Sequence, residues 1–217
     1  MPKVKKYVAP IEVAFTGIPT VWDGKAAIIE MREAHYPHWR QMEWIGFYFQ
    51  FLCEQRLKNL FEFQQPKYGR TSFDGLFHIP FDFKAHATNT SSHSIVINDA
   101  EAIEHALQEY GAVGLLIAIG DVTYNDEDRS FQKWHDEFKG KPSEYVLRNR
   151  ERGAWSRLRK YTMTLQQITV VELTRASLTK CGSFQTNFRN SDGSPRRAKV
   201  LIDLEKLGSE IVHCINY

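Results

Sequence analysis

The chain has 217 residues, of which 42% are hydrophobic and 13% aromatic, so it is long enough to bury a sizeable core in one domain. Its 28 basic residues nearly balance 26 acidic ones, and the formal net charge of +2 neither indicates nor excludes a nucleic-acid partner. The three cysteines, Cys53, Cys181 and Cys214, lack metal-ligand spacing, which argues against structural zinc and predicts a disulfide-free protein of a reducing compartment.

The sequence predicts neither a targeting segment nor a membrane segment. Residues 1–6 are basic, but no apolar region with a small-residue cleavage site follows them. The longest apolar run, residues 112–119, has the length of a buried strand and is too short to span a membrane. We therefore expect a cytoplasmic protein without a membrane anchor.

The N-terminal part is expected to contain a strand and two helices. The strand covers residues 7–15, and Asp23 is the expected N-cap of a short helix over residues 24–34. A long helix is expected over residues 37–61, because Pro37 suits a first helical turn and apolar side chains cover most of its circumference.

The long predicted helix also carries a line of polar side chains. At about 100° per residue, Glu43, Gln50 and Glu54 fall within about 20° of one line along the helix. Such a line is either a narrow exposed strip or a set of side chains directed into a functional site.

Residues 71–86 are expected to form a hairpin with two carboxylates and a lysine on one polar face. Asp82 and Lys84 point to the same side of the second strand because side chains alternate along a strand. Asp74 lies on the partner strand. Such a cluster on a half-buried sheet is costly unless a hard divalent cation such as Mg²⁺ binds it, although it can also be a solvated face.

These residues resemble the signature of the PD-(D/E)XK nuclease superfamily. Asp74 corresponds to the first acid, and Asp82-Phe83-Lys84 corresponds to the (D/E)xK segment. Phe73 stands where the family usually has proline, and the interval between the two acids is near the short end. The register of the hairpin decides whether Asp74 faces Asp82 or lies on the Phe83 side.

The resemblance implies a metal-dependent active site. Asp74 and Asp82 would hold Mg²⁺, for which Mn²⁺ can substitute, and Lys84 would orient or help to deprotonate the attacking water. In this family the helix before the hairpin often contributes a further glutamate that binds metal or positions water. Glu43 is our candidate for that role, with Glu54 in reserve.

The middle of the chain predicts a strand, helix, strand order. The polar loop after Lys84 contains His86 and Asn89, which are either DNA contacts or part of an ordinary loop. A helix capped by Asn98 or Asp99 should end at Gly111, and the apolar run after it reads as a central strand covered on both faces. This order favours a mixed α/β sheet.

The C-terminal half is rich in basic side chains. After a solvated acidic loop and a helix over residues 130–138, a basic helix is expected over residues 143–160, interrupted at Gly153. A strand over residues 165–173 precedes a hairpin, and the tail is uninformative. The candidate DNA contacts, which can equally be solvated, are Arg148, Arg150, Arg152, Arg157, Arg159 and Lys160 in the helix and Arg189, Arg196, Arg197 and Lys199 in the hairpin.

Taken together, the sequence predicts one α/β nuclease domain over residues 1–217. Its central mixed sheet is flanked by helices within residues 37–175, and a C-terminal β-hairpin and tail occupy residues 176–217. The family resemblance implies a Mg²⁺-dependent, sequence-specific double-stranded DNA endonuclease, a type II restriction enzyme that acts as a homodimer in a bacterial or archaeal cytoplasm. The alternatives are a repair or junction nuclease with the same core and a non-enzymatic DNA-binding protein.

Overall fold

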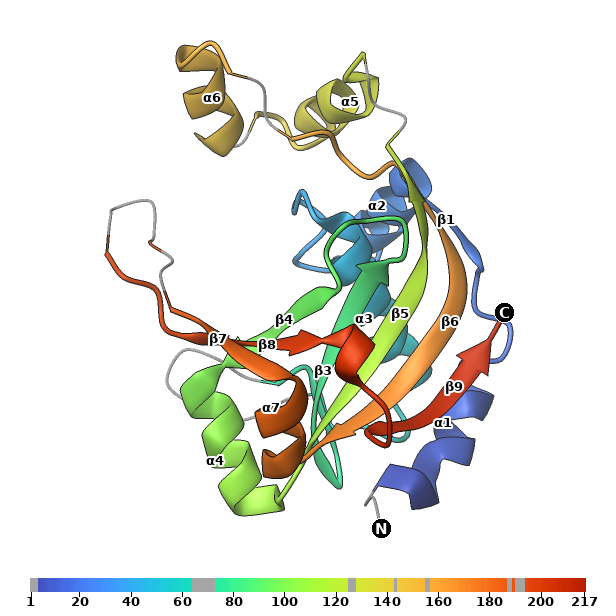
Figure 1. The fold of residues 1–217 in the computed structure, drawn as a ribbon. Coiled ribbons are helices and arrows are strands. Elements are labelled where there is room, and N and C mark those ends of the chain that lie inside the picture. Colours follow the sequence, from blue (N-terminus) through green and yellow to red (C-terminus); the bar gives the residue numbers. More distant parts are fainter. Residues whose placement is uncertain are drawn as a thin grey trace.

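A mixed six-stranded sheet forms the centre of the molecule (Figure 1). The computed structural model describes residues 4–63, 73–124, 128–142, 144–154, 157–186, 189 and 194–217. The strands follow the order β1 (Val21–Asp23), β6 (Thr162–Leu173), β5 (Val113–Thr123), β3 (Ile79–Ala87) and β2 (Gly75–Phe77), with β9 (Ile211–Asn216) also paired to β6. Strands β3 and β5 run parallel and the other pairs run antiparallel. The predicted α/β class with a mixed central sheet is therefore confirmed.

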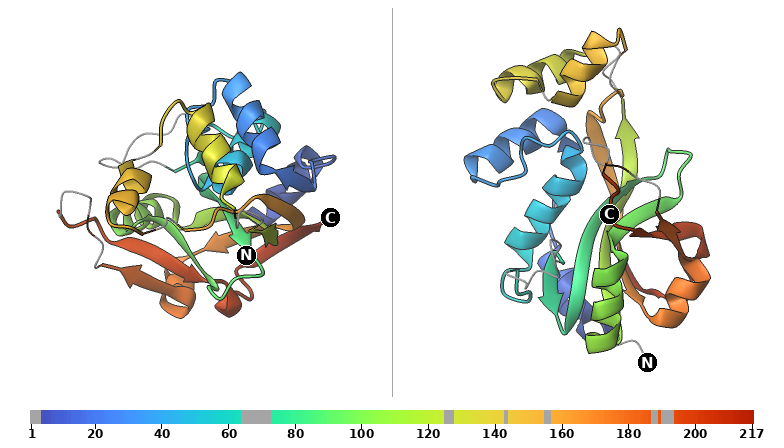
Figure 2. Two further views of the ribbon diagram at one scale, coloured as in Figure 1. Left: turned by 90° about the horizontal axis from the view of Figure 1, so that it is seen from above. Right: turned by 90° about the vertical axis from the view of Figure 1, so that its left-hand side faces the viewer.

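Helices and a second sheet cover the two faces of this central sheet (Figure 2). One face packs against α1 (Val8–Ala14), α2 (Gly24–Glu33) and α3 (Trp44–Arg56). The other packs against α4 (Ala100–Tyr110), α7 (Arg175–Cys181) and a three-stranded sheet of β4 (Ser94–Asp99), β8 (Lys199–Asp203) and β7 (Gly182–Gln185). Helices α5 (Ser130–Phe138) and α6 (Glu144–Glu151) lie beyond the end of the main sheet. No helix in the described part of the chain is long and apolar enough to cross a membrane.

Strand β5 is buried on both sides, as its continuous apolar run predicts. Leu116 and Ala118 belong to the core under α3, whereas Leu115 and Ile117 belong to the core under α4. Helix α4 ends where expected, because Gly111 adopts a left-handed conformation with φ of 78°. The buried β5 holds the neighbouring β3 in a fixed register.

Several other predicted elements are confirmed. Asp23 caps α2 by accepting a 2.9 Å hydrogen bond from the Ala26 amide. The first predicted hairpin is formed by β2 and β3, which turn at His78 with φ of 61°. The C-terminal hairpin is formed by β7 and β8, with Gln185 opposite Lys199.

Two predicted elements are wrong or too long because tertiary packing overrides local preference. Residues 7–15 form helical turns rather than a strand, and Val8, Ile11 and Phe15 are buried at helical spacing. The long helix expected from residue 37 begins only at Trp44. Before it, the chain turns so that the rings of Trp39 and Phe138 meet edge to face at 5.6 Å.

The C-terminal half differs from expectation in three places. The basic helix is confined to α6, and Gly153 (φ 66°) follows its end, so residues 157–161 are not helical. Helix α7 was not predicted, nor was β4 in the first half of the chain. The tail, for which no structure was predicted, forms a short 3₁₀ turn at Leu204–Lys206 and then β9. Strand β9 pairs with residues of β6 that lie 40 to 49 positions earlier in the chain.

Two glycine substitutions test the packing around β3 and α3. Gly114 on β5 lies opposite Phe81, and an added Cβ would overlap the buried Phe81 ring. We expect Gly114→Ala to lower the free energy of unfolding by about 1–3 kcal/mol in urea titrations. The matched control is Gly46→Ala, where no atom lies within 4 Å of the new Cβ, so the helix should gain about 0.5–1 kcal/mol. Equal effects at both positions would contradict this packing.

Candidate active site

Strand β3 places Asp82 and Lys84 on the face of the sheet opposite to α3. Their neighbours Phe81 and Phe83 point into the core under α3, so alternation along the strand directs Asp82 and Lys84 to the other side. The Lys84 Nζ atom lies 3.7 Å from Asp82 Oδ2. The Asp82 side chain is only 2% exposed, whereas the Lys84 side chain is 25% exposed. A buried carboxylate and a partly exposed ammonium group therefore meet on this face.

Asp74 lies at the edge of β3, where the short strand β2 ends. Its amide donates to the Phe81 carbonyl at 2.9 Å, and its Oδ2 accepts a 2.7 Å hydrogen bond from the Phe83 amide. Its Oδ1 accepts a 3.0 Å hydrogen bond from Gln50 Nε2 on α3. The β2–β3 pairing ends at Gly75 opposite Phe81, and two donors hold the Asp74 carboxylate at the strand edge beyond it.

Burial leaves the Asp82 carboxylate poorly compensated. Burial, with a smaller contribution from the Asp74 charge, raises the pKa of Asp82 to about 6, although Lys84, Asn98 and Lys199 oppose that rise. The Asn98 amide donates to Asp82 Oδ1 over a long 3.4 Å. Asp82 Oδ2 has no hydrogen-bond partner among the described residues. A buried carboxylate oxygen without a donor is rare and is a feature of functional sites.

Lys84 remains a cation in this environment. Burial acts to lower the pKa of Lys84, but the charges of Asp82 and Asp74 outweigh it and raise the pKa. The charges of Asp74, Asp82 and Lys84 therefore act on one another. The ammonium group therefore partly neutralises two carboxylates and still faces the solvent.

The oxygen atoms at this edge suit a hard divalent cation. Asp82 Oδ2, the carboxylate of Asp74 and the Phe83 carbonyl would be its oxygen ligands, since the carbonyl of a strand residue points to the same edge as its amide. Within the described residues no group of three or more His, Cys, Asp or Glu side chains can hold a metal ion. Mg²⁺ commonly binds one or two carboxylates and completes its shell with water and substrate phosphate, so this donor set fits it.

The line of polar side chains along α3 contributes Gln50 to the site, whereas the sequence prediction selected Glu43 and Glu54. Glu43 precedes the helix, is 64% exposed and pairs with Lys160, whose Nζ lies 3.9 Å from Glu43 Oε2. Gln50 instead contacts Asp74. Burial and the Asp74 charge raise the pKa of Glu54, against the hydrogen bond that Tyr36 donates at 3.2 Å. The sequence could have indicated Gln50, because it lies on the same side of the predicted helix as Glu43 and Glu54.

A cleft of about 620 Å³ lies beside Lys84. Lys84 and His86 of β3 line it together with β4, and the segment before β6 adds Arg157 and Lys160. Burial, followed by the charges of Lys160 and His93, lowers the pKa of His86, so its imidazole is neutral at pH 7. The cleft therefore combines the Lys84 ammonium with further basic side chains on its wall.

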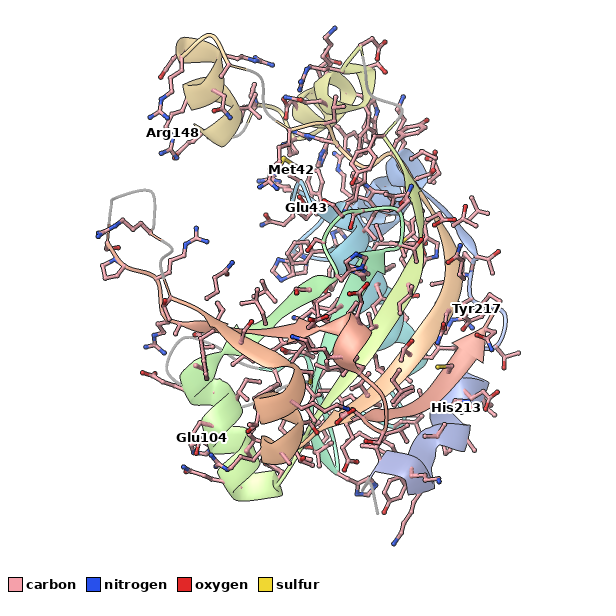
Figure 3. The ribbon with its side chains drawn as sticks, in the orientation of Figure 1. Met42, Glu43, Glu104, Arg148, His213 and Tyr217 are labelled. Atoms are coloured by element: carbon pink, nitrogen blue, oxygen red, sulfur yellow. The ribbon has the colours of Figure 1, made fainter. Side chains whose placement is uncertain are left out.

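Two basic elements project from the same side of the molecule, and Figure 3 shows Arg148 on α6 with Met42 and Glu43 on the segment that leads into α3. One element is α6 with the residues after it, and the other is the β7–β8 hairpin. The predicted DNA contacts that are exposed there are Arg148, Arg150, Arg152, Arg157, Arg189, Arg196 and Arg197. Arg148 and Arg197 also pair with surface carboxylates, at 3.7 Å and 3.5 Å. Such exposed pairs are weak and exchange readily for phosphate.

Arg159 does not belong to this exposed basic surface, contrary to the sequence prediction. Its side chain is only 1% exposed, and its guanidinium lies 3.0 Å from His135 Nδ1 and 3.4 Å from Asp136 Oδ1. Lys139 pairs with the same Asp136 oxygen at 3.0 Å. Burial, helped by the charges of Lys139 and Arg159, lowers the pKa of His135 to about 4. Arg159 therefore links the segment before β6 to α5 through its contacts with His135 and Asp136.

Two other predicted DNA contacts are also engaged within the fold. Lys199 Nζ lies 2.6 Å from Oδ1 of the buried Asp99. The Asn89 side chain donates to the Val122 carbonyl at 2.7 Å and accepts from the Val122 amide at 3.1 Å. Asn89 thus attaches the loop after β3 to the end of β5. The sequence shows these polar side chains but not the distant groups that they bind.

The chain matches no protein-family model and no curated protein. One solved structure with some similarity is the crystal structure of the restriction endonuclease BglI bound to its DNA recognition sequence. The sequences are 9% identical, the TM-score is 0.36, and the match covers 98% of this chain and 93% of that chain. No residue role is transferred at this level of similarity.

The buried charge of Asp82 predicts a stability that falls as pH rises. The folded state binds the Asp82 proton more tightly than the unfolded chain, so stability is lost between pH 3.8 and about 6, and the difference corresponds to about 3 kcal/mol. We expect Asp82→Asn to raise the free energy of unfolding by about 2–3 kcal/mol at pH 8 with EDTA. The gain should disappear near pH 4. A variant that is less stable than the wild type at pH 8 would contradict the burial argument.

A pair of arginine substitutions separates the buried ion pair from the exposed surface. Arg159→Met leaves Asp136 with one fewer cationic partner in the interior and should cost about 3–5 kcal/mol in urea titrations. Arg157→Met, two residues earlier and exposed, should change the free energy of unfolding by less than about 0.5 kcal/mol. The structural role of Arg159 is rejected if both variants are equally stable.

Proposed function

We propose that this protein is a Mg²⁺-dependent endonuclease that hydrolyses phosphodiester bonds in double-stranded DNA. The observation that carries the proposal is a buried Asp82 oxygen that has no hydrogen-bond donor in the described part of the chain. It lies near Asp74 and Lys84, and Lys84 lines a cleft with basic walls. An arrangement of this kind is costly to maintain and becomes favourable when a divalent cation binds between the carboxylates.

The roles of the residues follow from their positions. Asp82 and Asp74 would hold the cation, which when bound makes a coordinated water more acidic and polarises a phosphate oxygen. Gln50 and the Phe83 amide fix the orientation of the Asp74 carboxylate. Lys84 reaches the solvent side of the site, where its ammonium group would stabilise negative charge on the phosphate and hold the attacking water.

The buried Asp82 and the half-buried Asp74 favour an enzyme over a non-enzymatic DNA-binding protein. A surface that only binds DNA gains affinity from cations that neutralise phosphates. The carboxylates of Asp74 and Asp82, next to the cleft-lining Lys84, would offset its attraction for a phosphate and weaken such binding. Their presence next to Lys84 is explained if they recruit a divalent cation for hydrolysis.

The exposed arginines supply the attraction for DNA. Those on α6 and on the β7–β8 hairpin project from the same side as the cleft, so phosphates of one duplex would contact both elements. We further propose that residues 1–217 act as one nuclease domain, as a homodimeric type II restriction enzyme that cuts a short palindromic sequence in a bacterial or archaeal cytoplasm.

Digestion of a sequenced phage DNA tests the activity. We expect Mg²⁺-dependent cleavage that stops with EDTA, and sequencing of the fragment ends should give one recurrent sequence. Lys84→Ala and Asp82→Ala should each reduce the cleavage rate by at least about 100-fold, because the first removes a cation that would stabilise the phosphate charge and the second removes a ligand of the proposed cation. The control is Arg175→Ala, which removes a surface ion pair with Glu104 between α7 and α4 and should keep full activity.

Three results would change the assignment. Discrete bands support a restriction enzyme, whereas a smear on plasmids with preferred cleavage of branched DNA supports a repair or junction nuclease. Binding without metal-dependent cleavage supports the DNA-binding alternative. Normal cleavage by both the Lys84 and the Asp82 variants would reject this site.

A further inference from the structure

Glu43 and Lys160 form a charged pair that the proposed hydrolytic site does not use. Both side chains line the 620 Å³ cleft, and both also line a side pocket of about 110 Å³ together with His86. Glu43 comes from the turn before α3 and Lys160 from the segment before β6. Their charged atoms lie 3.9 Å apart, which is longer than a hydrogen bond. Each group therefore retains hydrogen-bonding capacity toward a third partner.

Hydrogen bonds hold the backbone near Glu43 and Lys160 in place, while both side chains line the cleft. The indole N–H of the buried Trp44, next to Glu43, donates to the Lys160 carbonyl at 2.8 Å. The next residue, Tyr161, donates its amide to the Thr123 carbonyl at 2.8 Å. The side chains of Glu43 and Lys160 remain 64% and 30% exposed. A rigid frame with two exposed polar ends is suited to recognition, since little order is lost on binding.

A carboxylate beside an ammonium group complements a hydrogen-bond donor beside an acceptor. A phosphate offers acceptors alone, and the Glu43 carboxylate would repel it. The edge of a G·C base pair offers both groups, namely cytosine N4–H beside guanine O6 in the major groove and guanine N2–H beside cytosine O2 in the minor groove. In the major groove an A·T pair also offers a donor beside an acceptor, adenine N6–H beside thymine O4. In the minor groove an A·T pair has acceptors alone, so a carboxylate beside an ammonium group distinguishes G·C from A·T in the minor groove.

The position of the pair relates it to the proposed cleavage site. His86 lies two residues beyond Lys84 on β3, which is about 6.6 Å along the strand. Base pairs in DNA are stacked about 3.4 Å apart, so this distance corresponds to about two base pairs. The imidazole of His86 is neutral at pH 7 and does not attract phosphate to this part of the cleft.

We propose that Glu43 and Lys160 read a G·C base pair in the minor groove within about two base pairs of the scissile phosphate, with Glu43 accepting from guanine N2–H and Lys160 donating to cytosine O2. The inference rests on the proposed function for its reference to a scissile phosphate. It also gives Glu43 a role different from the metal ligand that the family resemblance implies.

Cleavage of a randomised duplex library tests the proposal, with the base frequencies read at every position relative to the cut. The wild type should enrich G·C at one position within two base pairs of the cut. Glu43→Ala and Lys160→Met should each reduce that enrichment by about tenfold and keep the enrichment at other positions. The matched control is Arg157→Met, which removes a cation from the cleft wall but leaves the Glu43–Lys160 pair intact. This variant should slow cleavage of all sequences alike.

A selection of bound duplexes without metal gives a second readout that does not depend on hydrolysis. The wild type should prefer G·C at one position, and the Glu43 and Lys160 variants should lose that preference. The proposal is overturned if the wild type shows no G·C preference in this selection, or if both variants keep it. It is also overturned if Glu43→Ala abolishes cleavage of every sequence as Asp82→Ala does. Absence of Mg²⁺-dependent cleavage with an intact, Glu43-dependent G·C preference would reject the nuclease assignment and support base reading.

Discussion

The burial of the Asp82 carboxylate is the constraint on which the rest of the site depends. Burial, with a smaller contribution from the charge of Asp74, raises the pKa of Asp82 to about 6 against the opposing effects of Lys84, Asn98 and Lys199. The surrounding residues reduce this cost but do not remove it, because Oδ2 has no hydrogen-bond donor among the described residues. A fold that keeps such a group sacrifices stability at a position where a cation can bind.

The architecture brings the three charged groups to one place through the two cores. Strand β5 is apolar on both faces and fixes β3, so that alternate residues of β3 enter opposite environments. Strand β2 is short and leaves the edge of β3 unpaired beyond Phe81. There the Asp74 carboxylate accepts a hydrogen bond from the Phe83 amide. Helix α3 then completes the edge with Gln50. Packing of β3 between the two cores therefore places Asp82, and the hydrogen bonds from Gln50 and the Phe83 amide orient Asp74.

The basic residues divide into two sets with different physical roles. Arg159 is buried against His135 and Asp136, and it connects α5 to the sheet. The exposed arginines of α6 and the β7–β8 hairpin remain available for phosphate. The buried set also affects the response to acid. The lowered pKa of His135, about 4, makes stability rise with pH up to about 6.5, whereas Asp82 makes it fall in an overlapping range.

The sequence by itself determined the features that depend on local periodicity. Asp82 and Lys84 share a face because side chains alternate along a strand, and residues 112–119 form a doubly covered strand because they are continuously apolar. Asp23 caps α2 for the same local reason. The roles of these residues in catalysis remain proposals.

Only the tertiary structure decided which polar groups meet. In the folded chain Asp74 contacts Gln50, Glu43 pairs with Lys160, and Arg159 contacts His135. The C-terminal strand β9 also joins the central sheet. These partners lie between 24 and 117 positions apart in the chain. No local pattern specifies such pairs, because each is selected by the way in which whole helices and strands pack against the two cores.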